Sequence, residues 1–323
     1  EPKSPWELSL AEIVNEGVVS IPVKSKNYET ALVKVNNFGN VYLLASISKE
    51  KAERKKGYSK YYFKLVVFGK DKIVKEFDFD YPENNISFFD MIPSKNNKFF
   101  CSGFLTNLKG GRKKLISDEM FFTTFDCKTL ALENSKMIKV EGLYPERLRG
   151  SKDYVPYKIR EIFEKSDGGF SIVAEQYKLV VVRTKYGTSY IYFYCDVACV
   201  QTDKEMNVTS ISRIPKYQKN ARNPSIVSTF KDDKTFIIYE DLASNLDATT
   251  DKNTKKSSSS IFKSRNKNAL FMLEIDKEGK PTKKIIYDYK ESDIKPFILG
   301  SRNIGDGLVL LSGNDQLGIL EIK

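Results

Sequence analysis

The sequence ends on a strand-like motif that also occurs about fifty residues earlier, and this repetition limits the possible folds. Leu270–Asp276 (LFMLEID) and Leu317–Lys323 (LGILEIK) share two leucines, a glutamate and an isoleucine at matching positions. Related segments are LVVFGKD (Leu65–Asp71), MFFTTFD (Met120–Asp126) and VACVQTD (Val197–Asp203). Each complete copy is followed by a polar turn, a second strand and an apolar hairpin, which gives about four strands per unit. This pattern predicts a β-propeller.

The N-terminal segment from Val18 onward aligns with the later units but lacks their first strand. We expect Leu317–Lys323 to supply it by pairing with the first fifty residues, because closing a ring of sheets removes two open edges. The sequence therefore predicts one all-β domain over residues 1–323, a propeller of five blades closed by pairing of the N- and C-terminal strands. A sixth blade would have to lie within a longer connection. The polar segment 242–267, rich in serine and lysine, is expected to be a mobile insertion.

Two residue types in the repeat have a structural explanation. The aspartates that end the motif precede polar turns, where a carboxylate accepts backbone N–H bonds, so we do not interpret them as catalytic. The cysteines lie in apolar strand-like runs and should be buried small side chains that do not define a redox compartment. They are Cys101, Cys127, Cys195 and Cys199.

Composition excludes several classes of function. The chain has no histidine, which rules out Ser-His-Asp and Cys-His catalysis and mixed His/Cys zinc sites, and we expect no metal or cofactor. Its net charge is +11, but the lysines are spread over the loops as on a solvated surface. Without a nucleic-acid-binding motif we expect no nucleic acid partner, although polyanion binding through the lysine loops stays an alternative with steep salt dependence.

No apolar run is long enough for a transmembrane segment. The start EPKSPWELS is most simply that of a mature or trimmed chain.

One position of the repeat carries the candidate site. Aligning the last apolar strands of the units brings two carboxylates, Glu175 and Glu240, level with Ala45, Ser102 and Ser312. Carboxylates on neighbouring blades could face each other across a channel, where they could support acid–base chemistry or hold a cation. Alternatively, they end their strands and pair with nearby Lys or Arg. A third acid in register is missing, since Asp90 belongs to a different strand of its unit.

Several segments resemble a family of secreted, uncharacterised proteins from Bacteroidota. The resemblance rests on DGGFSIVAEQYK, on the Asp-turn repeats and on FMLEIDKEGKPTKKIIYDY, and it covers the chain from about Tyr61 to the C-terminus. It implies export to the periplasm or cell surface and a non-enzymatic or unknown role, and it provides no functional residues to transfer.

These observations lead to one main hypothesis and one rival. We expect a non-catalytic propeller that works as a binding or scaffold module at the cell envelope or outside the cell, with a protein or glycan partner. It would have no catalytic residues, and its binding residues would be Glu175, Glu240, Ser102 and Ser312. The alternative is a carbohydrate-active, glycosidase-like propeller that uses the Glu175–Glu240 pair.

Overall fold

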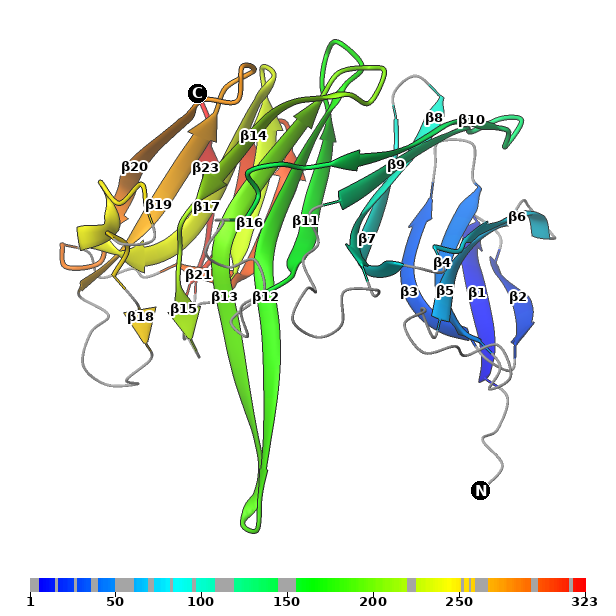
Figure 1. The fold of residues 1–323 in the computed structure, drawn as a ribbon, viewed down its shortest axis with the longest axis horizontal. Coiled ribbons are helices and arrows are strands. Elements are labelled where there is room, and N and C mark those ends of the chain that lie inside the picture. The colour runs from blue at the N-terminus through cyan, green and yellow to red at the C-terminus, as the bar shows by residue number, and fades with distance from the viewer. Residues whose placement is uncertain are drawn as a thin grey trace.

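The protein is built almost entirely of β-strands (Figure 1). The computed structural model describes residues 6–14, 17–25, 28–35, 40–49, 61–68, 73–81, 84–94, 97–107, 119–144, 155–219, 225–250, 253–255, 257–258, 267–291, 296–313 and 316–323. In these ranges no helix is long and apolar enough to cross a bilayer. The predominance of strands in the described ranges confirms the predicted all-β class.

The strands form an N-terminal hairpin and five sheets, numbered here in chain order. The hairpin consists of β1 (Trp6–Val14) and β2 (Gly17–Ser25). Sheet 1 contains β3 (Tyr28–Val35), β4 (Val41–Ser48), β5 (Tyr61–Phe68) and β6 (Ile73–Phe79). Sheet 2 contains β7 (Asn84–Pro93), β8 (Lys98–Asn107), β9 (Glu119–Asp126) and β10 (Leu132–Lys139).

The other three sheets repeat this antiparallel order with small variations. Sheet 3 contains β11 (Tyr157–Glu164), β12 (Phe170–Thr184), β13 (Gly187–Thr202) and β14 (Val208–Ile214), extended by the short β15 (Gln218–Lys219) and β18 (Ser257–Ser258). Sheet 4 contains β16 (Ile226–Lys231), β17 (Lys234–Leu242), β19 (Asn268–Ile275) and β20 (Pro281–Asp288), with the short 3-10 helix η3 (Ala243–Asn245) after β17. Sheet 5 contains β21 (Phe297–Gly305), β22 (Leu308–Ser312) and β23 (Leu317–Glu321).

The burial of each strand follows from its place in the sheet. The third strands β9 and β19 are apolar along most of their length and buried on both faces, because each sheet packs between two neighbours. The outer strand β10 instead alternates exposed and partly buried residues. Apolar clusters fill the spaces between successive sheets, and Phe100, Phe122 and Tyr157 lie in the one between sheets 2 and 3.

The first strands of successive sheets lie beside one another, in the order β3, β7, β11, β16 and β21. In Figure 1 sheets 1 to 4 follow each other across the molecule in chain order, from β1–β6 on one side to β19 and β20 on the other, and the strands of sheet 5 overlap those of sheets 3 and 4 in this view. This arrangement is propeller-like, and it places the first strands nearest a common centre.

The predicted closure of the ring is wrong. Strand β23 pairs with β22, from Leu308↔Glu321 to Ser312↔Leu317, and the N-terminal strands pair with each other from Trp6↔Ser25 to Val14↔Gly17. The described residues show no pairing between β23 and either N-terminal strand. Short hairpin connections make both pairings local, so neither has to close a chain-length loop. The sheets are separate and the ring is not closed.

The assignment of the terminal motif to the start of a unit is also wrong. The repeated motif forms β5, β9, β13, β19 and β23, which are the third strands of the five sheets and not the first. Each pairs with the apolar strand that precedes it in the chain. The repeated motif does correspond to a repeated strand, but the period of a sequence repeat does not show where one sheet ends and the next begins. The orphan strand at the C-terminus therefore completes sheet 5, not the first sheet.

The predicted structural roles of the aspartates and cysteines are confirmed where the structure describes them. Asp126 Oδ1 accepts hydrogen bonds from the backbone N–H groups of Lys128 and Thr129, and Asp276 Oδ1 accepts them from Glu278 and Lys280. All four cysteines are buried and form no disulfide. Burial raises the pKa of the Cys199 thiol to about 11.

Part of the predicted insertion 242–267 is anchored. The Asn245 side chain is buried and donates to both carboxylate oxygens of Asp241, at 3.1 Å, and to the backbone oxygen of Lys255. Residues 251–252, 256 and 259–266 lie outside the described residues. The mobility of this insertion, like the single-domain organisation, stays a prediction.

Candidate functional site at the inner strands of sheets 2 and 3

The four candidate residues lie on the second strands of their sheets, as the alignment predicts, but they do not form one site. Ser102 is on β8, Glu175 on β12, Glu240 on β17 and Ser312 on β22. Val173, two residues before Glu175, packs between sheets 3 and 4, whereas Ile238, two residues before Glu240, packs between sheets 4 and 5. Since alternate residues of a strand share a face, the two glutamates belong to different inter-sheet spaces. The expectation that they face each other is wrong.

Glu175 is held by two cations inside the protein. Its Oε2 accepts hydrogen bonds from Arg160 Nη2 at 2.6 Å, from Arg160 Nε at 3.0 Å and from Ser225 Oγ at 3.1 Å. Its Oε1 accepts a hydrogen bond from Lys216 Nζ. The side chains of Glu175 and Lys216 are 0% exposed, whereas that of Arg160 is 19% exposed. The cluster therefore reaches solvent on its Arg160 side.

Glu240 is bound mainly by uncharged groups. Its Oε1 accepts a hydrogen bond from Asn268 Nδ2 at 2.6 Å, and its Oε2 accepts one from the Tyr289 hydroxyl at 3.4 Å. Its backbone oxygen accepts from Gln218 Nε2 at 2.6 Å, and Gln218 in turn accepts from Lys216. Gln218 thus connects the main chain of Glu240 with Lys216 and hence with Glu175.

Ser102 and Ser312 lie apart from each other as well as from the glutamates. The Ser102 hydroxyl is buried and has no hydrogen-bond partner among the residues that the structure describes, and Ser102 pairs directly with Asp90 of β7. Ser312 lines an apolar cavity of about 320 Å³ between sheets 4 and 5, together with Pro296 and Leu317. Only Ser102 is therefore placed next to a further acidic side chain.

Lys158 connects sheet 2 with sheet 3 at this level. It is directly paired with Glu175, on the innermost strand β11, and its Nζ lies 5.7 Å from the ring centre of Phe88 and 5.8 Å from that of Tyr177. Burial and the nearby Arg160 lower the pKa of Lys158, while the carboxylates of Glu175 and Asp90 act in the opposite direction. The charges of both carboxylates therefore act on the Lys158 ammonium group. We call Asp90, Lys158, Arg160 and Glu175 the inner-strand cluster.

The sequence contains signals for this cluster. Asp90 lies in a different strand of its unit from the aligned position, but strand pairing brings it level with Ser102 and hence with that position. The alternating basic residues in YKIREIF place Lys158 and Arg160 close together on β11. Lys216, in contrast, follows β14 and has no pattern that could have indicated its buried contact with Glu175.

Asp241 is a second buried acid that sequence reasoning missed. It is 2% exposed, accepts two hydrogen bonds from Asn245, and lies on the face of β17 opposite to Glu240. Burial raises the pKa of its carboxyl to about 6, even though these hydrogen bonds and the charge of Lys216 favour the ionised form. Because it is enclosed and bound to a neighbouring loop, its role is structural.

The raised pKa of Asp241 predicts a pH-dependent stability. The carboxyl has a pKa of 3.8 in the reference state and about 6 in the folded protein, so the folded state holds this proton more tightly, and stability falls as the pH rises between these values. Asp241→Asn should therefore raise the free energy of unfolding at about pH 7.5 by about 2–3 kcal/mol. Urea denaturation across the pH range measures it.

The parent and Asp241→Asn should be equally stable below about pH 3, where the carboxyl is protonated in both the folded and the unfolded state. Asp232→Asn, which removes a carboxylate at an exposed position two residues before β17, is the matched control variant. A stability difference that is the same at all pH values would contradict the raised pKa.

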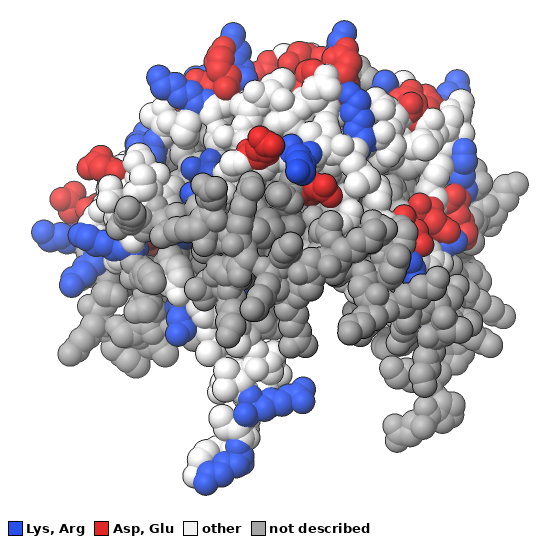
Figure 2. Space-filling model, in the orientation of Figure 1, with Lys and Arg blue, Asp and Glu red and all other residues white. Residues whose placement is uncertain are grey.

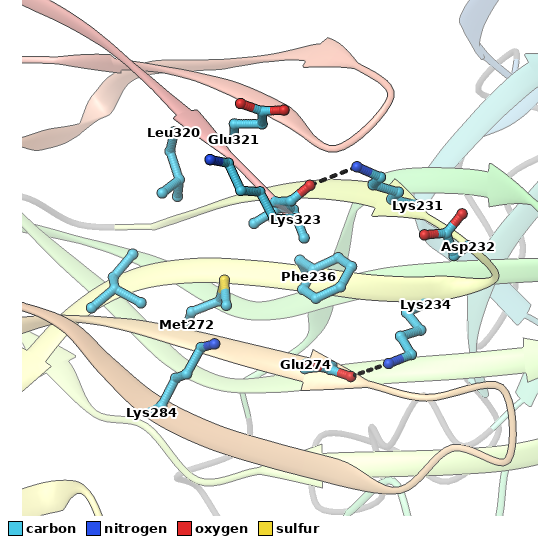
Figure 3. Close-up of a pocket in the computed structure, with 12 residues that line it drawn as sticks. Lys231, Asp232, Lys234, Phe236, Met272, Glu274, Lys284, Leu320, Glu321 and Lys323 are labelled. Atoms are coloured by element: carbon cyan, nitrogen blue, oxygen red, sulfur yellow. Dashed lines mark hydrogen bonds and ion pairs between the residues drawn. The ribbon is translucent and has the colours of Figure 1, made fainter.

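A second hollow, between sheets 4 and 5, is shown in Figure 3. It has a volume of about 360 Å³ and carries both basic and acidic side chains. These groups bind within the protein: Lys234 Nζ lies 2.7 Å from Glu274 Oε1, and Lys231 Nζ donates to the backbone oxygen of Ile322 at 2.7 Å. Two lysines of this hollow thus already bind groups of the protein itself.

Comparisons with known proteins identify similar folds. No protein-family model and no curated protein matches the sequence. Among solved structures, a thermostable family-43 glycoside hydrolase is 11% identical, with 89% of this chain and 86% of that chain covered at a TM-score of 0.34. A putative exo-β-1,3-galactanase from Bifidobacterium bifidum is 10% identical, with 90% and 87% covered at 0.32. The β-propeller domain of the Trilobed protease from Pyrococcus furiosus is 9% identical, with 93% and 83% covered at 0.28.

These matches do not support the expectation of a non-catalytic scaffold without enzymatic activity, since glycoside hydrolases recur among them. At these TM-scores and identities, however, the likeness carries no argument about the function of this chain. The inner-strand cluster is therefore the basis for a proposed function.

Proposed function

We propose that this protein is a carbohydrate-active enzyme that hydrolyses a glycosidic bond at the inner-strand cluster. The observation that carries the proposal is the position of Lys158, which is paired with Glu175 across β11 and β12 and whose Nζ lies 5.7 Å from the ring centre of Phe88 and 5.8 Å from that of Tyr177. The carboxylates of Glu175 and Asp90 both act to raise its pKa, against the effects of burial and of Arg160. Two carboxyl groups, cations that bind hydroxyl or acid groups, and aromatic faces are what a sugar site requires.

The two carboxyl groups have different surroundings and would have different tasks. Glu175 is itself enclosed, and its charge-assisted hydrogen bonds would position Arg160, the residue through which the cluster reaches solvent. Asp90 lies on the neighbouring first strand β7, outside the paired cations of Glu175, and would donate the proton to the departing oxygen. Arg160 and Lys158 would orient the substrate.

A glycan partner outside the cytoplasm fits this proposal. The resemblance to a secreted family supports a location in the periplasm or at the cell surface, where polysaccharides are encountered. The inner-strand cluster lies on strands of sheets 2 and 3, so the proposal does not depend on a closed ring of sheets.

Hydrolysis of a panel of aryl glycosides and oligosaccharides tests the proposal. We expect the parent to release product from at least one substrate, and Asp90→Asn and Glu175→Gln each to lower kcat/KM by about 100-fold or more. Glu240→Gln is the matched control: it changes an equally placed glutamate that faces the other side of sheet 4, and it should retain activity.

Far-UV circular dichroism and melting curves should show that the variants are folded. Absence of turnover on the whole panel by the parent would contradict the proposal. An equal loss in Glu240→Gln would also contradict it, because the effect could then not be assigned to the inner-strand cluster.

A further inference from the structure

Strands β12 and β13 continue far beyond the rest of sheet 3 and form a two-stranded ribbon, residues 177–194. The two strands stay paired from Tyr177↔Tyr194 to Thr184↔Gly187. Figure 1 shows this ribbon projecting away from all five sheets. Most of its residues are exposed, and Tyr186 near the tip is 88% exposed. The ribbon therefore contributes little to the core of the protein.

The ribbon is apolar on both faces. One face carries Leu179, Val181, Tyr190 and Tyr192, with exposures of 39–55%, and the opposite face carries Val180, Val182 and Ile191. A two-stranded hairpin is only marginally stable in water by itself, and exposed apolar surface of this kind marks a binding surface. Something is therefore expected to cover the ribbon when the protein works.

The charge of the ribbon restricts what that partner can be. From Tyr177 to Cys195 the chain contains no acidic residue, but it contains Lys178, Arg183 and Lys185. Figure 2 shows basic and no acidic side chains on the projecting part, whereas both signs are mixed over the sheets. Charge complementarity therefore points to a negatively charged partner.

The tyrosines of the ribbon lead to the inner-strand cluster. Tyr190, Tyr192 and Tyr194 occupy alternate positions of β13 and share one face, about 7 Å apart. The rings of Tyr194 and Tyr177 at the base are 5.2 Å apart, and the guanidinium of Arg160 lies 5.8 Å from both. A row of aromatic rings thus runs from solvent to the residue that binds Glu175.

We propose that the ribbon is a binding tract for an anionic polysaccharide, whose sugar rings stack on Tyr190, Tyr192 and Tyr194. Its carboxylate or sulfate groups bind Arg183 on the same face and Lys185 in the turn, while Lys178 on the opposite face adds to the positive charge of the ribbon. The proposal rests on the proposed function and adds the substrate class: an acidic polymer guided along the ribbon to the inner-strand cluster. Aromatic rings with a polar edge and planar guanidinium groups are suited to such ligands.

Two other anionic partners fit the ribbon less well. A membrane-inserting hairpin would need an apolar tip, but the tip here is Thr184-Lys185-Tyr186-Gly187. Single-stranded nucleic acid carries a phosphate at every residue and is bound in a positively charged groove, whereas the ribbon offers three cations on a narrow projection. A polysaccharide with spaced charges matches the sparse cations and the row of rings.

Binding to polymers, measured without turnover, tests this proposal. Isothermal titration of the full chain with polygalacturonate and with heparin should show binding to at least one of them, and titration with dextran should show none. Tyr190→Ala/Tyr192→Ala and Lys178→Gln/Arg183→Gln/Lys185→Gln should each weaken the binding about tenfold. Lys204→Gln/Lys277→Gln/Lys280→Gln removes the same charge from exposed positions elsewhere and should leave binding unchanged.

Several outcomes would overturn the proposal. These are absence of binding to both anionic polymers, an equal loss in the control triple variant, or ribbon-dependent binding to phosphatidylglycerol vesicles or oligo(dT) in place of a polysaccharide. Circular dichroism excludes unfolding as the cause. Turnover on the same preparations separates the two proposals: hydrolysis without ribbon-dependent binding contradicts only the tract, and ribbon-dependent binding without hydrolysis contradicts only the enzyme.

Discussion

Lys216→Met should lower the free energy of unfolding by about 3–5 kcal/mol, because it leaves the buried carboxylate of Glu175 without one of its two cations. Both side chains of this ion pair are fully enclosed, so water cannot replace the lost ammonium group. Arg160 continues to bind Oε2, but Oε1 loses its charged donor. Urea denaturation followed by tyrosine fluorescence and circular dichroism measures the loss.

Two further variants make this prediction specific. Lys234→Met removes the cation from the partly exposed pair with Glu274, where the cost should be at most about 1 kcal/mol. Adding Glu175→Gln to Lys216→Met should restore part of the lost stability, because the uncompensated buried charge is then removed as well. If Lys216→Met costs no more than Lys234→Met, the buried pair does not stabilise the fold as described here.

Deletion of residues 317–323 should destabilise the protein by more than about 5 kcal/mol, and the shortened chain should unfold or aggregate. The deletion removes strand β23 and the buried side chain of Ile322, which packs between sheets 4 and 5. It also removes the hydrogen bond from Lys231 Nζ to Ile322 O and that from Ile322 N–H to Gly307 O. Strand β22 would become an unprotected apolar edge.

Graded controls connect this effect to β23 itself. Ile322→Ala should cost about 2–4 kcal/mol, as for other buried isoleucines, and removal of the exposed Lys323 alone should cost little. Thermal melting and light scattering report stability and aggregation separately. A chain lacking residues 317–323 that melts at the temperature of the parent would show that sheet 5 does not depend on its last strand.

The candidate site shows which parts of a site are visible in a sequence. The alignment found the correct strands for Glu175 and Glu240, because the spacing of apolar runs and turns is local information. It could not determine which face each side chain occupies, since a register irregularity such as the one between Ile159 and Glu161 on β11 changes facing without changing the pattern. Asp90 and Lys158 come near each other only through the packing of β7 against β11, strands of two different sheets, which the sequence does not show.

The sequence by itself determined the all-β class, the unit of about four strands, the turn aspartates and the buried cysteines. Each depends on residues close in the chain: alternation of apolar side chains, a carboxylate beside its turn, and apolar runs long enough to be covered on both faces. Only the tertiary structure decided that the motif strand is third in its sheet, that β23 pairs with β22 and the ring stays open, and that Glu175 and Glu240 are separated by sheet 4. These features depend on competition between local hairpins and distant strands that are chemically alike, and that competition is decided by loop entropy and packing between sheets.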